Sequence, residues 1–133
     1  MYTAILLDKE SRDELKRLAY HWFNEIRDWQ LYCHHLTLNM GPMDKGLNDS
    51  KLLGYNAVIQ VDAAGMNDHA AACRATKFVT TCGTELKSTN KTPHITMAVD
   101  ASNGGKPVMS NDINWWIPLT PKTFRGKVVE IGV

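Results

Sequence analysis

The sequence predicts a single α+β domain with several antiparallel strands and at least one long packing helix. Short apolar segments recur along the chain between polar stretches rich in Gly, Asn, Ser and Thr, which is typical of strands joined by loops. One segment near the N-terminus instead repeats its apolar residues with the period of a helix. With 133 residues, 44% of them hydrophobic and 22% charged, the chain has the size and composition of one globular domain, residues 1–133.

The first predicted elements are a strand and the long helix. Tyr2–Leu7 is an apolar run that ends in charge, which favours a strand. Ser11 and Glu14 then have the spacing of a capping box, in which two side chains satisfy the backbone amides at a helix start. Apolar residues at helical spacing follow and predict a helix of about 15 residues with one buried stripe. The stripe consists of Leu15, Leu18, Ala19, Trp22, Phe23 and Ile26.

The remaining segments predict mainly strands and loops. Strands are expected at residues 34–40, 55–62, 92–99, 113–119 and 127–133. Residues 70–78 suit a strand or a short helix because alanine fits both, and we favour a strand. Polar stretches at 43–51 and 80–92 predict loops, and residues 103–107 predict a turn.

Two matching four-residue motifs lie 59 residues apart (94 − 35): His35-Leu36-Thr37-Leu38 and His94-Ile95-Thr96-Met97. Of the five histidines, only these two have a hydroxyl residue two positions further on. Side chains alternate faces along a strand, so each histidine shares a face with its threonine while the apolar residues face the core. The same alternation predicts that His34 points into the core and that His35 points into a cleft.

Two such pairs around one cleft have the chemistry that cleavage of a phosphodiester needs. The pKa of imidazole lies close to neutrality, so one histidine can accept a proton while the other donates one. The hydroxyls of Thr37 and Thr96 can donate hydrogen bonds to the phosphate oxygens as negative charge develops there. The predicted catalytic residues are therefore His35, Thr37, His94 and Thr96, in an arrangement that requires neither a metal nor another cofactor.

These paired phrases resemble the motifs of the two-histidine (2H) phosphoesterase superfamily, and Pro93-His94-Ile95-Thr96 is typical of its second motif. The superfamily includes 2′-5′ RNA ligase-like proteins, cyclic phosphodiesterases of RNA repair and nucleases that trim RNA ends. A looser resemblance links Ser110-Asn111, the segment from Trp116 and the segment from Gly126 to the phosphodiesterase domain of fungal-type tRNA ligases and to small phage relatives.

The resemblance implies a bilobal α+β fold with antiparallel sheets and a pseudo-two-fold axis through a central cleft. It also implies an enzyme, a metal-independent phosphodiesterase acting on a 2′,3′-cyclic phosphate or phosphodiester in a nucleotide or at an RNA end. Cyclic oligonucleotides that serve as immune signals, which phage members of the superfamily destroy, are the second substrate class. ADP-ribose 1″,2″-cyclic phosphate is the third. A module of another class, which sequesters nucleotides without cleaving them, is the remaining alternative.

Other residues are weaker candidates for substrate binding. Tyr55 and Trp116 could stack on a base, and Lys91, just ahead of the second motif, could contact a phosphate. Packing and solvation are the ordinary roles of such side chains. The run Cys33-His34-His35 suggests a metal site or a thiol nucleophile, but no third ligand follows at a usual spacing, so we expect no metal site.

Composition also limits the expected partners and location. The net charge of +1 does not favour non-specific binding to long nucleic acids or anionic membranes, so we expect a small anionic ligand and no obligate protein partner. Three cysteines without Cys-x-x-Cys spacing favour free thiols. The N-terminal apolar run is too short for a signal peptide or a membrane span. We therefore expect a cytoplasmic protein, in the host cytoplasm if a phage encodes it.

Overall fold

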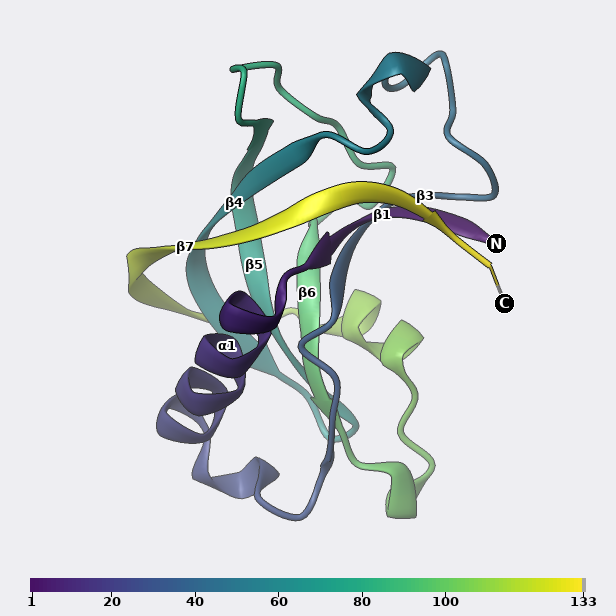
Figure 1. Ribbon diagram of the computed structural model, residues 1–133. Coiled ribbons are helices and arrows are strands. Elements are labelled where there is room, and N and C mark those ends of the chain that lie inside the picture. Colours follow the sequence, from purple (N-terminus) through teal and green to yellow (C-terminus); the bar gives the residue numbers. More distant parts are fainter. Residues whose placement is uncertain (133) are drawn as a thin grey trace.

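The computed structural model describes residues 1–132 and confirms an α+β fold (Figure 1). Its strands are β1 (Tyr2–Leu7), β2 (Gln30–Leu31), β3 (His35–Met40), β4 (Asn56–Met66), β5 (Ala70–Thr80), β6 (His94–Val99) and β7 (Trp116–Ile131). The described part of the chain holds one α-helix, α1 (Lys9–Trp22). Four short 3-10 turns complete it: η1 (Asn24–Ile26), η2 (Ser50–Leu52), η3 (Ala101–Asn103) and η4 (Pro107–Asp112). No helix in this range is long and apolar enough to cross a membrane.

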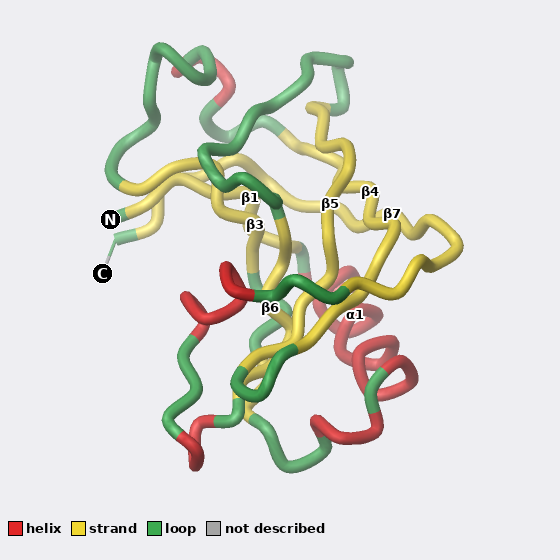
Figure 2. Tube along the Cα trace, turned by 180° about the vertical axis from the view of Figure 1, so that it is seen from behind, coloured by secondary structure: helices red, strands yellow, loops and turns green. Residues whose placement is uncertain are grey.

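Antiparallel pairing closes the sheet into a barrel. The strands follow one another in the order β6-β3-β1-β7-β4-β5, and β5 pairs again with β6. Within residues 1–132 the barrel therefore has six strands, and the short β2 pairs with β6 next to the end of β3. Seen from behind, β6 lies between β3 and β5 (Figure 2). The strand with the second histidine motif is thus held on both sides.

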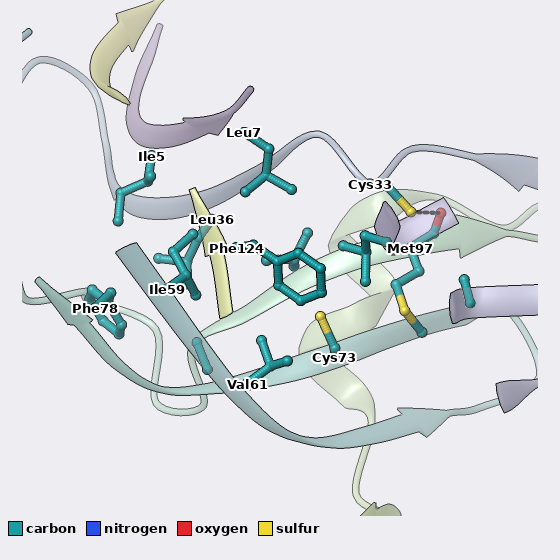
Figure 3. Packing of buried hydrophobic residues seen from close by; sticks show 14 of the residues in the cluster. Ile5, Leu7, Cys33, Leu36, Ile59, Val61, Cys73, Phe78, Met97 and Phe124 are labelled. Atoms are coloured by element: carbon teal, nitrogen blue, oxygen red, sulfur yellow. Dashed lines mark hydrogen bonds between the residues drawn. The ribbon is translucent and has the colours of Figure 1, made fainter. Parts of the chain in front are cut away.

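Alternating burial along the strands fills the barrel with apolar side chains. Along β3, Leu36 and Leu38 are completely buried whereas Thr37 between them is only half-buried. Phe124 of β7 lies in the middle of the packed residues, with Ile59 of β4 and Met97 of β6 on either side (Figure 3). Residues of α1 and η1 join the same core, as the helical stripe predicted. The buried members of that stripe are Leu15, Leu18, Ala19, Phe23 and Ile26.

Helix α1 begins earlier than the capping-box pattern predicted, so that prediction was wrong. The N-cap is Asp8, whose Oδ1 accepts a hydrogen bond from the Ser11 amide at 2.8 Å. The Ser11 hydroxyl instead accepts a hydrogen bond from the Arg125 amide of β7 at 2.7 Å, and Glu14 forms an ion pair with Arg17. Ser11 therefore ties the helix to the barrel and does not cap it.

Two further segments differ from the sequence expectation. Residues 113–119 and 127–133 were predicted as separate strands, but both belong largely to the continuous β7; Val133 lies outside the described residues. The sequence did not predict one continuous strand because proline, here Pro118 and Pro121, cannot donate a ladder hydrogen bond. The strand accommodates both prolines because this part of β7 pairs with β4 alone. The turn η4 was not predicted. Residues 70–78 form part of β5, as favoured.

Candidate functional site

The pairing of β3 with β6 brings the two histidine motifs together. The strands meet at Leu36 and Ile95, which are both completely buried in the core. Alternation turns the residues on either side of these two away from the core, to the outer face of the barrel. Because the strands are antiparallel, the histidine end of each motif meets the threonine end of the other. The residues gathered in this way are His35, Thr37, His94 and Thr96.

His94 is held by a backbone carbonyl. Its Nδ1 lies 2.8 Å from the Thr92 oxygen, which can only accept, so Nδ1 carries the hydrogen and Nε2 is left for chemistry. Only 8% of the residue is exposed. Burial lowers the pKa of His94 by disfavouring the charged imidazolium, and the Thr92 carbonyl opposes this by stabilising it.

His35 lies among aromatic rings. Its ring centroid is 4.8 Å from that of Tyr2, and its Nδ1 is 3.0 Å from Nδ1 of His34. Burial lowers the pKa of His35 to about 4, and the positive forms of His34 and His94 lower it as well. A positive charge on His94 therefore opposes the protonation of His35.

His34 does not point into the core, so the prediction from strict alternation was wrong. The Cys33 amide donates a hydrogen bond to the Thr96 carbonyl, whereas Leu36 pairs with Ile95. Residues 33 and 36 are three positions apart, whereas their partners on β6, residues 96 and 95, are one position apart. Two extra residues are therefore inserted between β2 and β3. Cys33 takes up this insertion with a φ of 52° in the left-handed region. Its side chain enters the core, and the half-buried His34 lies beside His35.

The two threonines differ in their surroundings. Thr96 Oγ1 lies 2.8 Å from Oγ of Ser110, a buried residue of η4. If Ser110 donates in this contact, the Thr96 hydroxyl hydrogen remains available for a phosphate oxygen. The Thr37 hydroxyl has no hydrogen-bond partner among residues 1–132, and the Thr37 carbonyl accepts a hydrogen bond from Ser88 Oγ at 2.8 Å. The loop before β6 is thus attached to β3 beside the site.

The predicted substrate-binding residues are not all brought to this site. The ring of half-buried Trp116 stands 5.8 Å from the guanidinium carbon of Arg74, the β5 residue that pairs with His94. Gly65 permits this position, since a Cβ there would overlap the Trp115 carbonyl and the Trp116 ring. Lys91 is exposed in the loop three residues ahead of His94. Tyr55 is exposed ahead of β4 and is separated from β3 by β1 and β7.

Arg74 is a candidate that sequence reasoning missed. It pairs directly with His94 across β5 and β6, and residues in such pairs have Cβ atoms about 5 Å apart. Its neighbours along the strand are buried, which leaves Arg74 on the outer face with the motif residues. Asp62 of β4 holds the guanidinium through contacts of 3.2 and 3.4 Å. The available signal was an arginine between Cys73 and Ala75 in a predicted strand that is otherwise apolar around it.

The cysteines contribute no reactive thiol at the motifs. Cys33 and Cys73 are free and buried, and Cys82 is free and exposed. Burial raises the pKa of Cys33 to about 12, so its thiol stays protonated near neutrality. In the described part of the chain, no three His, Cys, Asp or Glu residues are grouped so that they could hold a metal ion.

No family model and no curated protein sequence matches this chain.

Proposed function

We propose that this chain is a phosphodiesterase of the 2H type, which hydrolyses a cyclic phosphate or phosphodiester in a nucleotide or at an RNA end. The pairing of Leu36 with Ile95 supports this most strongly, because it gathers two imidazoles and two hydroxyls on one face. The same pairing relates the two motifs by a local two-fold axis. We further propose that the barrel is a small variant of the bilobal 2H fold, in which the two motifs form the related halves.

The environments of the two histidines favour different roles. The Thr92 carbonyl stabilises the imidazolium form of His94, whereas the neighbours of His35 are imidazoles and a phenol ring. His94 is therefore the general acid and His35 the general base. Nε2 of His35 takes a proton from water as the water oxygen bonds to phosphorus. Nε2 of His94 gives a proton to the ribose oxygen as its bond to phosphorus breaks.

The remaining polar groups stabilise the negative charge on the phosphate. The hydroxyl of Thr37, and that of Thr96 when Ser110 donates to it, can each donate to a non-bridging oxygen. Arg74, which pairs with His94 across β5 and β6 and whose guanidinium is held by Asp62, is the positively charged residue that would bind the phosphate. Donors that are already oriented lower the barrier most in a site shielded from water, and the low exposure of His94 fits this requirement.

The lowered histidine pKa values predict where the activity is highest. As pH falls, kcat/KM should decrease when the base is protonated, and as pH rises it should decrease when His94 loses its proton. Both pKa values are lowered from 6.5, that of His35 to about 4. A bell-shaped profile of kcat/KM with its maximum on the acid side of pH 6.5 is expected. A rate that rises steadily up to pH 10 would contradict the proposed pair.

A hollow beside β1 and β7 supports a second class of substrate, one that carries more than one phosphate. This hollow of about 480 Å³ is lined by Leu6, the β1 residue that pairs with His35, and by Arg125 and Lys127 of β7. Two cations there suit a second phosphate group. Cyclic and linear oligonucleotides therefore belong beside 2′,3′-cyclic mononucleotides in any substrate test.

The decisive experiment compares the wild type with His35→Gln, His94→Gln and the double variant, in EDTA. Substrates are 2′,3′-cyclic mononucleotides, 3′,5′-cyclic mononucleotides, cyclic di- and trinucleotides, and an RNA ending in a cyclic phosphate, with products identified by mass spectrometry. Each single change should lower kcat by on the order of 10²–10⁴, and the double variant should be little worse than either. His21→Gln, on the exposed surface of α1, is the matched control. Ligands that bind to the wild type and are recovered intact would favour the sequestering module.

A further inference from the structure

The contact between His34 and His35 has no part in the reaction described above. The two rings meet edge to face, with centroids 5.2 Å apart and an interplanar angle of 86°, and their Nδ1 atoms lie 3.0 Å apart. A neutral imidazole carries hydrogen on one nitrogen and a lone pair on the other. At this distance one Nδ1 must donate and the other must accept, so the contact fixes the tautomers of both rings.

The chemistry of His35 decides which ring donates. To take a proton from water at Nε2, neutral His35 must carry its hydrogen on Nδ1. His34 must then accept at Nδ1 and carry its own hydrogen on Nε2. The other half of the site has the same arrangement, because His94 donates from Nδ1 to the Thr92 carbonyl. Each motif histidine would thus have an acceptor behind it.

We propose that His34 is the positioning residue of His35, accepting the hydrogen of His35 Nδ1 and thereby directing His35 Nε2 to the substrate. The tautomer assignment rests on the proposed function, through the choice of His35 as base. The insertion at Cys33 is what makes the contact possible, because regular alternation would have placed adjacent side chains on opposite faces. Once His35 has taken its proton, the imidazolium stays hydrogen-bonded to His34.

The two acceptors differ in one respect: a carbonyl does not titrate, and an imidazole does. Protonated His34 carries hydrogen on both nitrogens, so two N–H groups would face each other and the contact would be lost. Burial and Arg12 on α1 both lower the pKa of His34. Besides Arg12, the titratable groups next to this pair of rings are His94 on β6, which lowers the pKa of His35, and Tyr2, which packs against His35. Near neutrality His34 therefore remains an acceptor, and in acid it releases His35.

His34→Asn and His34→Ala separate positioning from simple packing. The Asn Oδ1 atom can stand where Nδ1 of His34 stands, accept the same hydrogen bond, and not titrate. His34→Asn should keep kcat within about threefold and move the acid limb of kcat/KM to lower pH, since only the titration of His35 then remains. His34→Ala should lower kcat by on the order of 10² with little change in KM, because a misoriented base loses rate rather than binding. His21→Asn is the matched control. Equal kcat and equal pH profiles in wild type and His34→Ala would overturn the proposal.

Histidine tautomers measured by long-range ¹H–¹⁵N NMR give a readout that does not depend on turnover. In the wild type, His35 should carry hydrogen on Nδ1 and His34 on Nε2 at neutral pH. In His34→Ala, His35 should lose this preference, and in His34→Asn it should keep it. Hydrogen on Nε2 of His35 in the wild type would overturn the proposal even in an active enzyme. The expected tautomers without turnover of any substrate would support the positioning and overturn the proposed function.

Discussion

At the scale of single residues, the site depends on which group donates in each hydrogen bond. Ser110 is buried, and its hydroxyl reaches Thr96 from η4, a segment that follows β6 in the chain. Thr96 can offer its hydrogen to a phosphate only while Ser110 donates to it. Thr37 has no such partner within residues 1–132, and only its carbonyl is held, by Ser88. The two hydroxyls thus have different freedom although the motifs match in sequence.

Arg74 provides a prediction at this scale. Arg74→Ala should raise KM for a phosphodiester about tenfold with a smaller effect on kcat, because a charge-assisted hydrogen bond contributes about 1.5–3 kcal/mol to binding. Arg74→Lys should recover only part of this, since lysine cannot keep both contacts with Asp62. Lys77→Ala, at an exposed position of the same strand β5, checks the general effects of removing a positive charge there. Steady-state kinetics at fixed ionic strength measure the effect. An unchanged KM in Arg74→Ala would show that Arg74 serves only to hold Asp62 and Trp116.

The sequence was sufficient to predict the motif residues and insufficient for their neighbours. His35 and Thr37 follow the regular alternation of β3, so their common face could be predicted from period alone. His34 could not be placed, because the two-residue insertion depends on how β2 and β3 share the edge of β6. Arg74 was missed for a related reason: its value comes from pairing with His94, and pairing partners are not encoded in the period of one strand.

At the scale of elements, the start of α1 shows a competition between two polar residues. Asp8 and Ser11 both suit a helix N-cap, and Ser11 also has a glutamate three positions on. In the folded chain the Ser11 hydroxyl accepts a hydrogen bond from the backbone of β7, and Asp8 is the N-cap residue of α1. A contact with a distant strand therefore decided where the helix begins.

This competition gives the second prediction. Asp8→Ala should lower the free energy of unfolding by about 1 kcal/mol, because it leaves amides of the first turn without an acceptor. Asp8→Asn should retain most of the stability, since the amide oxygen can still accept. Asp13→Ala, which removes an exposed ion pair with Lys9, should leave the free energy of unfolding almost unchanged, because solvent and salt screen such a pair. Urea denaturation provides the comparison. An Asp8→Ala variant as stable as the wild type would mean that another group caps the helix.

At the scale of the whole molecule, closure of the barrel makes the site. β6 pairs with β5 on one side and with β3 on the other, so Arg74, His94 and Thr37 come from three strands that meet only because the sheet closes. The sequence predicted strands, their faces and the core positions, because these follow from local period and composition. It could not predict the closed order, since that depends on pairings between segments far apart in the chain. The merging of two predicted strands into β7 has the same origin: β7 is long enough to pair with both β1 and β4.

Burying the imidazoles also makes the stability of the whole fold depend on pH. The unfolded chain protonates His35 near pH 6.5, whereas the folded chain does so only near pH 4. Between these values the unfolded state binds more protons, so the free energy of unfolding should decrease as pH falls through this window and stop changing through His35 below it. This shift of about 2.5 pKa units (6.5 − 4) lowers the free energy of unfolding by at most about 3.4 kcal/mol between the two pH values. His34 and His94, whose pKa values are also lowered, act in the same direction. Urea titrations from pH 7.5 to 4 should show a shallower decrease for His35→Gln than for the wild type, while the exposed His21→Gln should follow the wild type. Parallel curves for the wild type and His35→Gln would mean that His35 is protonated as readily in the fold as in water. The lowered pKa on which its role as a base depends would then be absent.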